Sequence, residues 1–195
     1  MILVSFRPLN AQTPAMDALK TKFQQGEVFQ AEFEHFFYDS FTQDTTRYSG
    51  KIWIGTNRYK VQTSNRTLLV VDSLSRVYDE VENRLIISHY DPEEDDFAPA
   101  RFLTRPASQY EASQSSENGS ITISFNSTDA FSYFKKISLH LSQSNIPQSV
   151  TAVDQTDNVL KTEFGDSRFI NTREQEIFEL NYPENAELID LRKEE

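Results

Sequence analysis

The chain has 195 residues, a formal net charge of −11 and no cysteine. Proteins bind nucleic acids and anionic membrane surfaces through clustered lysine and arginine side chains. A chain this acidic is therefore not expected to bind either of them as a regular partner. The absence of cysteine excludes thiol catalysis, disulfides and cysteine-ligated metals. Fifteen Phe, eight Tyr and one Trp indicate an interior rich in rings, which either fills a solid core or surrounds a cavity.

The N-terminal region predicts a leader followed by a helix. Residues 1–12 have the character of a signal-peptide remnant or a disordered leader, ahead of a single domain formed by residues 13–195. A helix is predicted over residues 13–25, because Thr13 suits the N-cap, Pro14 suits the first helical position and Gly26 follows the end. Met16, Leu19 and Phe23 share one side of it, so this helix must lie on an apolar surface.

The next segments predict an antiparallel wall of strands. Residues 28–38 alternate cleanly between apolar and polar side chains, and residues 48–55, 59–63, 67–71 and 76–78, continued at 84–89, form a meander of short strands. Nothing in the meander suggests catalysis, so it is interpreted as a wall. His35 falls on the apolar side of the first strand, where a lone histidine is expected to be a hydrogen-bonded border residue.

An acidic run over residues 91–96 precedes a short apolar segment that contains Phe97, Phe102 and Leu103. Together with Arg101, these residues have a spacing that fits one or two helical turns, and Pro99 fits only near the start of such a turn. A short helix inserted between strands suits a lid over a cavity. It equally suits a plug that fills the open end of a sheet, and the sequence leaves both interpretations open.

The remaining chain returns to strand patterns. Residues 113–119 are interpreted as a turn-rich connector, residues 121–126 and 137–142 as strands, and residues around 154–158 as the turn of a hairpin. Residues 167–176 are interpreted as a polar loop, and Phe178, Leu180 and Tyr182 alternate near the end. His140 is expected to face solvent without a partner.

The sequence offers no recognisable catalytic or cofactor site. His35, His89 and His140 lie on separate segments without the spacing of a zinc site. There is no G-x-S-x-G elbow, and five glycines leave no phosphate-binding loop. We therefore predict no enzyme activity, no cofactor and no metal.

Several motifs in order resemble a known family. They are SGKIWIG, a Tyr-Lys-Val strand, VVDSLSRVYDEVENRL, PARFL and FELNYPENAELIDL. Their succession over residues 16–192 resembles the periplasmic outer-membrane lipoprotein carrier family (LolA-like). The family's D-G-x-x-x-W-x-Y segment stands here as residues 72–79, without its Gly and Trp. An Arg after the Trp strand helps to hold the lid in that family, and only Arg58 is near the corresponding position.

The resemblance implies an α+β, mainly β fold, an unclosed antiparallel β-barrel covered by an N-terminal helix and a short lid helix. It implies a monomeric periplasmic carrier that binds the acyl chains of lipoproteins. The partners would be an inner-membrane lipoprotein-releasing ABC transporter and an outer-membrane acceptor. The alternative is a LolA-like module that senses lipids or lipoproteins and has no transport role.

Strand parity selects the residues that would line an acyl-chain cavity. The inward-facing candidates are Phe29, Phe33, Tyr59, Val61, Ile121, Ile123, Phe125, Ile137, Leu139 and Leu141. Trp53 is a further candidate, but its neighbours Ile52 and Ile54 have the opposite parity, so either face could be inside. Phe97, Phe102 and Leu103 are assigned to the lid and Arg58 to a possible lid latch. The central expectation is that part of the interior stays hollow.

Overall fold

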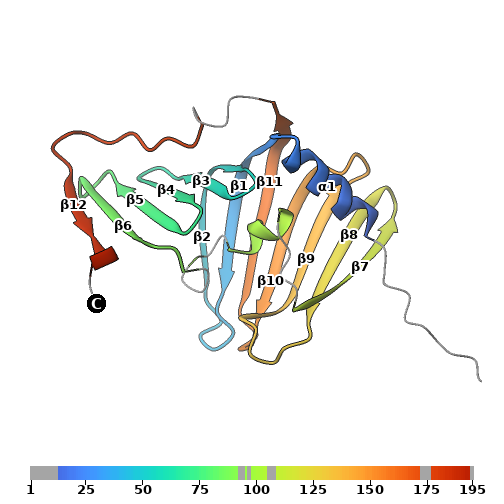
Figure 1. The fold of residues 1–195 in the computed structure, drawn as a ribbon. Coiled ribbons are helices and arrows are strands. Elements are labelled where there is room, and N and C mark those ends of the chain that lie inside the picture. Colours follow the sequence, from blue (N-terminus) through green and yellow to red (C-terminus); the bar gives the residue numbers. More distant parts are fainter. Residues whose placement is uncertain (1–12, 92–94, 96–97, 105–108, 172–176, 194–195) are drawn as a thin grey trace, which may run out of the picture.

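The structure is a computed structural model that describes residues 13–91, 95, 98–104, 109–171 and 177–193, so the predicted leader lies outside the described residues. One 12-stranded sheet dominates the described chain, with one α-helix and two short 3-10 helices (Figure 1). The strands are β1 (Val28–Tyr38), β2 (Thr45–Ile54), β3 (Arg58–Gln62), β4 (Arg66–Val71), β5 (Leu74–Asp79), β6 (Arg84–His89), β7 (Tyr110–Glu117), β8 (Ser120–Ser127), β9 (Phe134–Ser142), β10 (Pro147–Asp154), β11 (Val159–Ile170) and β12 (Glu187–Asp190). The helices are α1 (Pro14–Gln24), η1 (Ala98–Leu103) and η2 (Leu191–Lys193). The predicted fold class, a mainly β sheet that does not close into a barrel, is confirmed.

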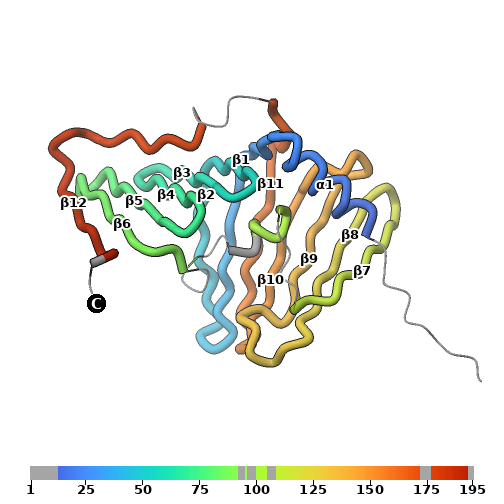
Figure 2. The backbone as a smooth tube through the Cα atoms, viewed as in Figure 1, coloured from blue at the N-terminus to red at the C-terminus, as the bar shows by residue number. Residues whose placement is uncertain are grey.

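The strand order is β12-β6-β5-β4-β3-β2-β1-β11-β10-β9-β8-β7. From β1 the chain builds one half of the sheet through β6, crosses to the far edge at β7, and returns strand by strand to β11 beside β1 (Figure 2). All described pairs are antiparallel except β12, which runs parallel to β6. The sheet therefore has two halves of different origin that join at the long β1–β11 pair.

Helix α1 forms where the sequence predicted it. Proline occupies its first turn, and Gly26, with φ +81°, ends it in the conformation that glycine adopts most readily. Thr13 stands at the N-cap, but its side chain makes no capping hydrogen bond. Instead the backbone N–H of Ala15 donates to Oε1 of Gln114 on β7 at 3.0 Å, which ties the helix start to the sheet edge.

The sheet has two faces with different covers. The inner face, which carries Phe29 and Phe33 of β1, packs against the buried side of α1 and against η1. The outer face, which carries Val28 and Leu69, packs against Phe178 in the segment that leads to β12. In Figure 1 the described part of this segment, residues 177–186, runs across to β12. Both faces of the first half-sheet are therefore partly apolar.

The sequence interpretation of residues 113–119 as a connector was wrong. Residues 110–117 form the edge strand β7, which pairs with β8 along its whole length. Asn118 and Gly119, with φ of 50° and 78°, make the two-residue turn of this hairpin. β7 is polar because it is an edge strand with one side in solvent, and this composition concealed it.

The C-terminal third differs from expectation in three places. β11 extends to Ile170, so the first residues of the predicted polar loop belong to a strand, and residues 172–176 lie outside the described residues. β12 was not predicted. His140 has a partner, because its Nδ1 lies 3.1 Å from Oγ1 of Thr122. His35 is fully buried, and its Nδ1 lies 2.9 Å from Oγ1 of Thr162.

Candidate functional site

The inner face beneath α1 and η1 is filled. Leu139 and Ile137 of β9 and Ile123 of β8 have no exposed surface, and the rings of Phe29 and Phe164 meet edge to face at 5.1 Å. Phe102 of η1 packs against Phe125 with ring centroids 5.6 Å apart. This half of the inner face is a packed core, which leaves no room for a guest unless the helices move.

The other half of the inner face holds a hollow of about 650 Å³. The strand register places Ile52, Val61, Leu68, Val77 and Ile86 in one row across five neighbouring strands, so these side chains share the inner face. Leu68, Val77 and Ile86 of this row are only partly buried. We name the space the inner hollow; the residues that line it are Arg47, Tyr48, Ser49, Val61, Thr63, Ser64, Asn65, Arg66, Leu68 and Val77.

The inner hollow has an apolar wall and a polar rim. The wall is formed by Tyr48, Val61, Leu68 and Val77. The β3–β4 turn at residues 63–65 and Arg66 at the start of β4 supply much of the rim. Its volume falls within the range of about 300–1,000 Å³ that is typical of small-molecule sites. An apolar wall with a polar opening suits an alkyl chain attached to a polar group.

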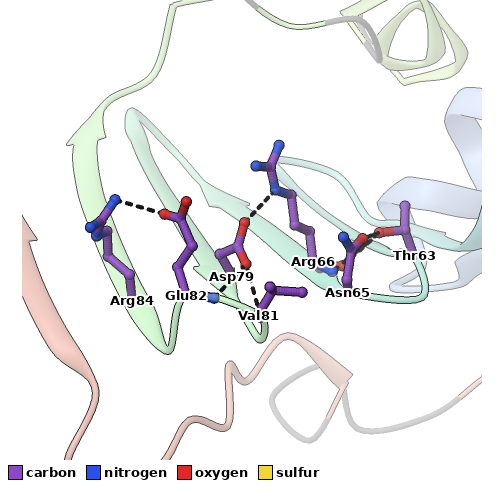
Figure 3. Close-up of polar contacts among 7 residues, drawn as sticks. All are labelled: Thr63, Asn65, Arg66, Asp79, Val81, Glu82 and Arg84. Carbon is purple, nitrogen blue, oxygen red and sulfur yellow. Dashed lines mark hydrogen bonds and ion pairs between the residues drawn. The ribbon is translucent and has the colours of Figure 1, made fainter.

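Arg66 is fixed at the rim by an ion pair. Its Nε donates to Oδ2 of Asp79 at 2.7 Å, and Oδ1 of Asp79 accepts hydrogen bonds from the backbone N–H groups of Val81 at 3.0 Å and Glu82 at 3.1 Å (Figure 3). The hydrogen bond from Arg66, supported by these backbone donors, lowers the pKa of Asp79. Because 63% of the Arg66 side chain is exposed, its charge meets solvent while the residue lines the hollow.

Tyrosines connect the inner face with the segment before η1. Tyr59 lies on the inner face, in register with Ile54 and Val70. Its hydroxyl donates to the carboxylate of Asp95, and the hydroxyl of Tyr90 donates to Oδ2 of the same carboxylate at 2.7 Å. Burial, followed by the charge of Asp95, raises the pKa of both phenols, so both remain protonated donors at neutral pH.

η1 is attached to the same cluster. The guanidinium of Arg101 lies 4.6 Å from the ring centroid of Tyr90, and Leu103 has no exposed surface. η1 therefore packs into the inner face, and both the lid and the plug interpretations stay predictions. Phe97, the third predicted lid residue, lies outside the described residues.

A second hollow of about 630 Å³ lies along β1, β2 and β11. Its lining includes the charged residues Glu32, Glu34, Lys51 and Glu163. An alkyl chain gains nothing from contact with charged groups that must stay hydrated. This hollow is therefore the poorer candidate for a lipid, although it is almost as large.

Strand parity identified the inner face correctly but selected mainly its filled half. Val61 is the one predicted candidate among the described residues that line the inner hollow. The others lie in or against the packed core, and Phe33 also lines the second hollow: Phe29, Phe33, Tyr59, Ile121, Ile123, Phe125, Ile137, Leu139 and Leu141. Ile121 is partly buried there, and the rest are buried.

Trp53 and Arg58 lie on the outer face. Trp53 packs against the cluster of Val28, Leu69 and Phe178, which answers the question that its parity left open. The guanidinium of Arg58 lies 5.1 Å from the ring centroid of Phe178. This cation–π contact joins Arg58 to the C-terminal segment. The assignment of Arg58 as a lid latch stays a prediction.

Tyr48, Leu68, Val77, Arg47 and Arg66 were missed as site residues. The β4 sequence Thr-Leu-Leu-Val-Val is apolar at nearly every position, so alternation does not reveal which side chains face inward. The structure explains this pattern, because the C-terminal segment covers the outer face of β4 at Leu69. Leu68 is paired with Val61, and directly opposed residues on neighbouring strands share a face. The predicted inward position of Val61 could therefore have identified Leu68 as inward-facing.

Two observations bear on other site classes. Among the described residues, no group of three or more His, Asp or Glu side chains is placed to hold a metal ion. Within the same ranges, no helix is long and apolar enough to cross a membrane.

Comparison with known proteins supports the fold. No protein-family model and no curated protein matches the sequence. An uncharacterised conserved protein from Thermus thermophilus superposes with a TM-score of 0.56 at 11% identity, over 91% of this chain and 98% of the other. A LolA superfamily protein from Nitrosomonas europaea gives 0.46 at 10% identity, over 85% and 97% of the two chains. A putative outer membrane lipoprotein-sorting protein domain from Vibrio parahaemolyticus gives 0.46 at 12% identity, over 85% and 94%.

At these identities the likeness concerns the fold alone. The solved structures with which the chain superposes include a LolA superfamily protein and a putative lipoprotein-sorting domain. The likeness to the Thermus thermophilus protein extends over nearly the whole of both chains.

Proposed function

We propose that the protein is a periplasmic carrier that binds an acyl chain of a lipoprotein in the inner hollow. It would receive its cargo from an inner-membrane lipoprotein-releasing ABC transporter and pass it to an outer-membrane acceptor. The observation that carries this proposal is the inner hollow itself, an apolar-walled space of about 650 Å³ with a polar rim. The lipidated end of a lipoprotein has matching chemistry, with an alkyl chain attached to a polar polypeptide.

The hydrophobic effect supplies enough free energy for such a complex. Each CH₂ group removed from water contributes about 0.8 kcal/mol, so complete burial of a sixteen-carbon chain would contribute roughly 12 kcal/mol. Contacts among exposed charges of this acidic protein contribute far less. Affinity should therefore depend on Leu68, Val77 and their neighbours, and only weakly on salt.

Release requires that the loaded state is not too stable. The inner hollow keeps part of the row at Leu68, Val77 and Ile86 exposed, so a chain bound there stays partly accessible from the rim. Displacing Phe102 and Leu103 of η1 would admit more of a chain but would expose a packed core. The cost of moving η1 would thus offset part of the gain, which leaves an acceptor able to compete.

Acyl binding can be tested with a pair of variants on opposite faces of the same half-sheet. Val77 lines the inner hollow, whereas Ile87 on the neighbouring strand faces outward; both are partly buried. We expect Val77→Asn to weaken binding of a fluorescent palmitoylated peptide about tenfold and Ile87→Asn to leave it unchanged. Equal affinities for both variants and the wild type would overturn the proposed site.

The carrier role needs a separate experiment. The protein is added to spheroplasts, and the medium is analysed for soluble one-to-one complexes with lipoproteins. We expect lipoproteins to appear in these complexes. If they stay on the membrane although the palmitoylated peptide binds, the sensing alternative is favoured. If the protein instead turns over a lipid ester, both binding proposals fail.

A further inference from the structure

Two phenylalanines protrude from turns of the sheet. Phe41, in the β1–β2 turn, and Phe131, in the β8–β9 turn, are each 95% exposed. Single exposed apolar residues are common on protein surfaces and need no explanation. These two differ from scattered residues because they share a local construction and lie on one end of the molecule.

An aspartate two residues earlier fixes each phenylalanine. Oδ1 of Asp39 accepts the backbone N–H of Phe41 at 2.8 Å, and Oδ1 of Asp129 accepts the backbone N–H of Phe131 at 2.9 Å. Both segments read Asp-x-Phe, and both form the turn in which an aspartate side chain caps the backbone that follows. The backbone at each tip is therefore held in place while the ring points into solvent.

The two tips are connected through a third turn. The backbone N–H of Ser40 donates to Oδ1 of Asn158 at 2.9 Å, and Nε2 of Gln155 donates to the carbonyl oxygen of Ser132 at 2.7 Å. The neighbours of both phenylalanines thus bond to the β10–β11 turn. Figure 1 shows the three turns at the same end of the sheet.

A partly exposed tyrosine lies next to each of these two turns, on the side of the strand. Tyr38 ends β1 and is 37% exposed, and Tyr133 precedes β9 and is 41% exposed. In membrane-bound proteins, phenylalanine enters the acyl boundary while the amphipathic ring of tyrosine sits at the level of the headgroups. We define Tyr38, Phe41, Phe131 and Tyr133 as the aromatic tip.

We propose that the aromatic tip contacts the interface of a lipid bilayer and inserts Phe41 and Phe131 among the acyl chains. The geometry favours a bilayer over a protein partner. The rings stand on separate turns, and a specific protein interface needs about 800 Å² of complementary surface on each partner. A bilayer is a continuous apolar phase, so separated rings can insert without a matching pocket.

The charge near the aromatic tip indicates the class of lipid. Hydrogen bonds from the backbone N–H groups of Thr42 and Phe41 lower the pKa of Asp39, so this carboxylate stays charged at neutral pH. Lys135 at the same end is paired with Asp157. With a net charge of −11 on the chain, binding should favour zwitterionic lipids and should depend little on salt.

This contact is independent of the inner hollow, because it uses other residues on other turns. It would bring the carrier to membrane surfaces where cargo is exchanged. Two rings give a weak and reversible attachment, which a protein that must leave the membrane requires. Failure of either proposal leaves the other standing.

Vesicle flotation tests the contact directly. Full-length protein is mixed with vesicles of phosphatidylcholine and phosphatidylethanolamine, and the bound fraction is measured against lipid concentration. We expect Phe41→Ser and Phe131→Ser each to lower the partition coefficient about tenfold, and the double variant to lower it about a hundredfold. Protein that does not float at millimolar lipid, or a double variant that binds like the wild type, would overturn the proposal.

Val81 supplies a matched control. It is 77% exposed and follows Asp79 by two residues with the same type of hydrogen bond, at 3.0 Å. It lies on the β5–β6 turn, away from the aromatic tip in Figure 1. We expect Val81→Ser to leave the partition coefficient unchanged. A loss as large as that of Phe41→Ser would show that any exposed apolar residue matters and would contradict a specific tip.

Fluorescence gives a second readout that does not depend on a loss of binding. Trp53 is the sole tryptophan, so Phe41→Trp in a Trp53→Phe background reports on the tip alone. We expect vesicles to shift its emission to the blue and lipids brominated in the acyl chain to quench it. Unchanged emission, or binding restricted to phosphatidylglycerol vesicles and abolished by salt, would overturn insertion.

Discussion

The two halves of the inner face are built from the same kinds of residue, yet one is full and the other is partly empty. Beneath α1 and η1, side chains such as Ile137 and Leu139 have no exposed surface. On the meander, Leu68 and Val77 keep part of their surface exposed beside a hollow of about 650 Å³. Helices, and not the sheet alone, therefore decide which part of this apolar face becomes core.

The largest expected difference between the filled and the open half of the inner face is in the free energy of unfolding that a truncated side chain costs. Phe125→Ala removes a fully buried ring that contacts Phe102, so we expect the free energy of unfolding to fall by about 3–5 kcal/mol. Leu68→Ala borders an existing hollow and loses fewer contacts, so we expect a loss of about 1 kcal/mol. Urea unfolding of both variants measures the difference. Equal losses would contradict the division into a full and an open half.

A larger side chain in the inner hollow should affect ligand binding strongly and the free energy of unfolding only slightly, in contrast to a truncation in the packed core. Leu68→Trp places a larger ring in the hollow, and we expect about a tenfold loss of affinity for the palmitoylated peptide, about 1.4 kcal/mol. Leu188→Trp on β12, at a position that is 60% exposed, is the control and should bind normally. Normal binding by Leu68→Trp would place the acyl chain elsewhere.

The attachment of η1 should be weakened by removing a charge. Asp95→Asn leaves Tyr59 and Tyr90 with a neutral acceptor, and hydrogen bonds to charged groups contribute about 1.5–3 kcal/mol. We expect faster hydrogen exchange of the backbone amides at residues 98 and 100–104. The exposed Glu80→Gln variant should exchange like the wild type. Unchanged exchange in Asp95→Asn would show that packing alone holds η1.

The smallest effect should be a pH dependence at the rim. The pKa of Asp79 is lowered in the folded state, so its ion pair with Arg66 contributes stability above the unfolded pKa of about 3.9. That contribution is lost as the pH falls through the lower, folded pKa. We expect Asp79→Asn to flatten the dependence of stability on pH below about 4. Urea midpoints between pH 2 and 7 test this, and an unchanged slope would contradict it.

The sequence predicted the elements whose patterns are local. The alternation in Val28–Tyr38 identified β1, and Pro14 with Gly26 identified the limits of α1. It also placed Phe29 and Phe33 on the inner face. It could not show that α1 and η1 fill the space above β8 and β9, because that packing joins residues far apart in the chain.

Two other features depended on long-range contacts. Thr-Leu-Leu-Val-Val in β4 has no readable alternation, since the C-terminal segment covers its outer face. The same C-terminal segment contacts Trp53 and Arg58 on the outer face of the sheet. β7 could have been found from Asn118-Gly119, which is a strong signal for a two-residue hairpin turn, but its polar edge composition obscured the strand.

The central claim is that the open half of the inner face receives an alkyl chain. A palmitoylated peptide with a photoreactive diazirine at the end of its chain tests this most directly. We expect mass spectrometry to find the cross-link at inner-hollow residues such as Tyr48, Leu68 or Val77. Cross-links confined to the outer face around Trp53 and Phe178, or no cross-link at saturating peptide, would contradict it.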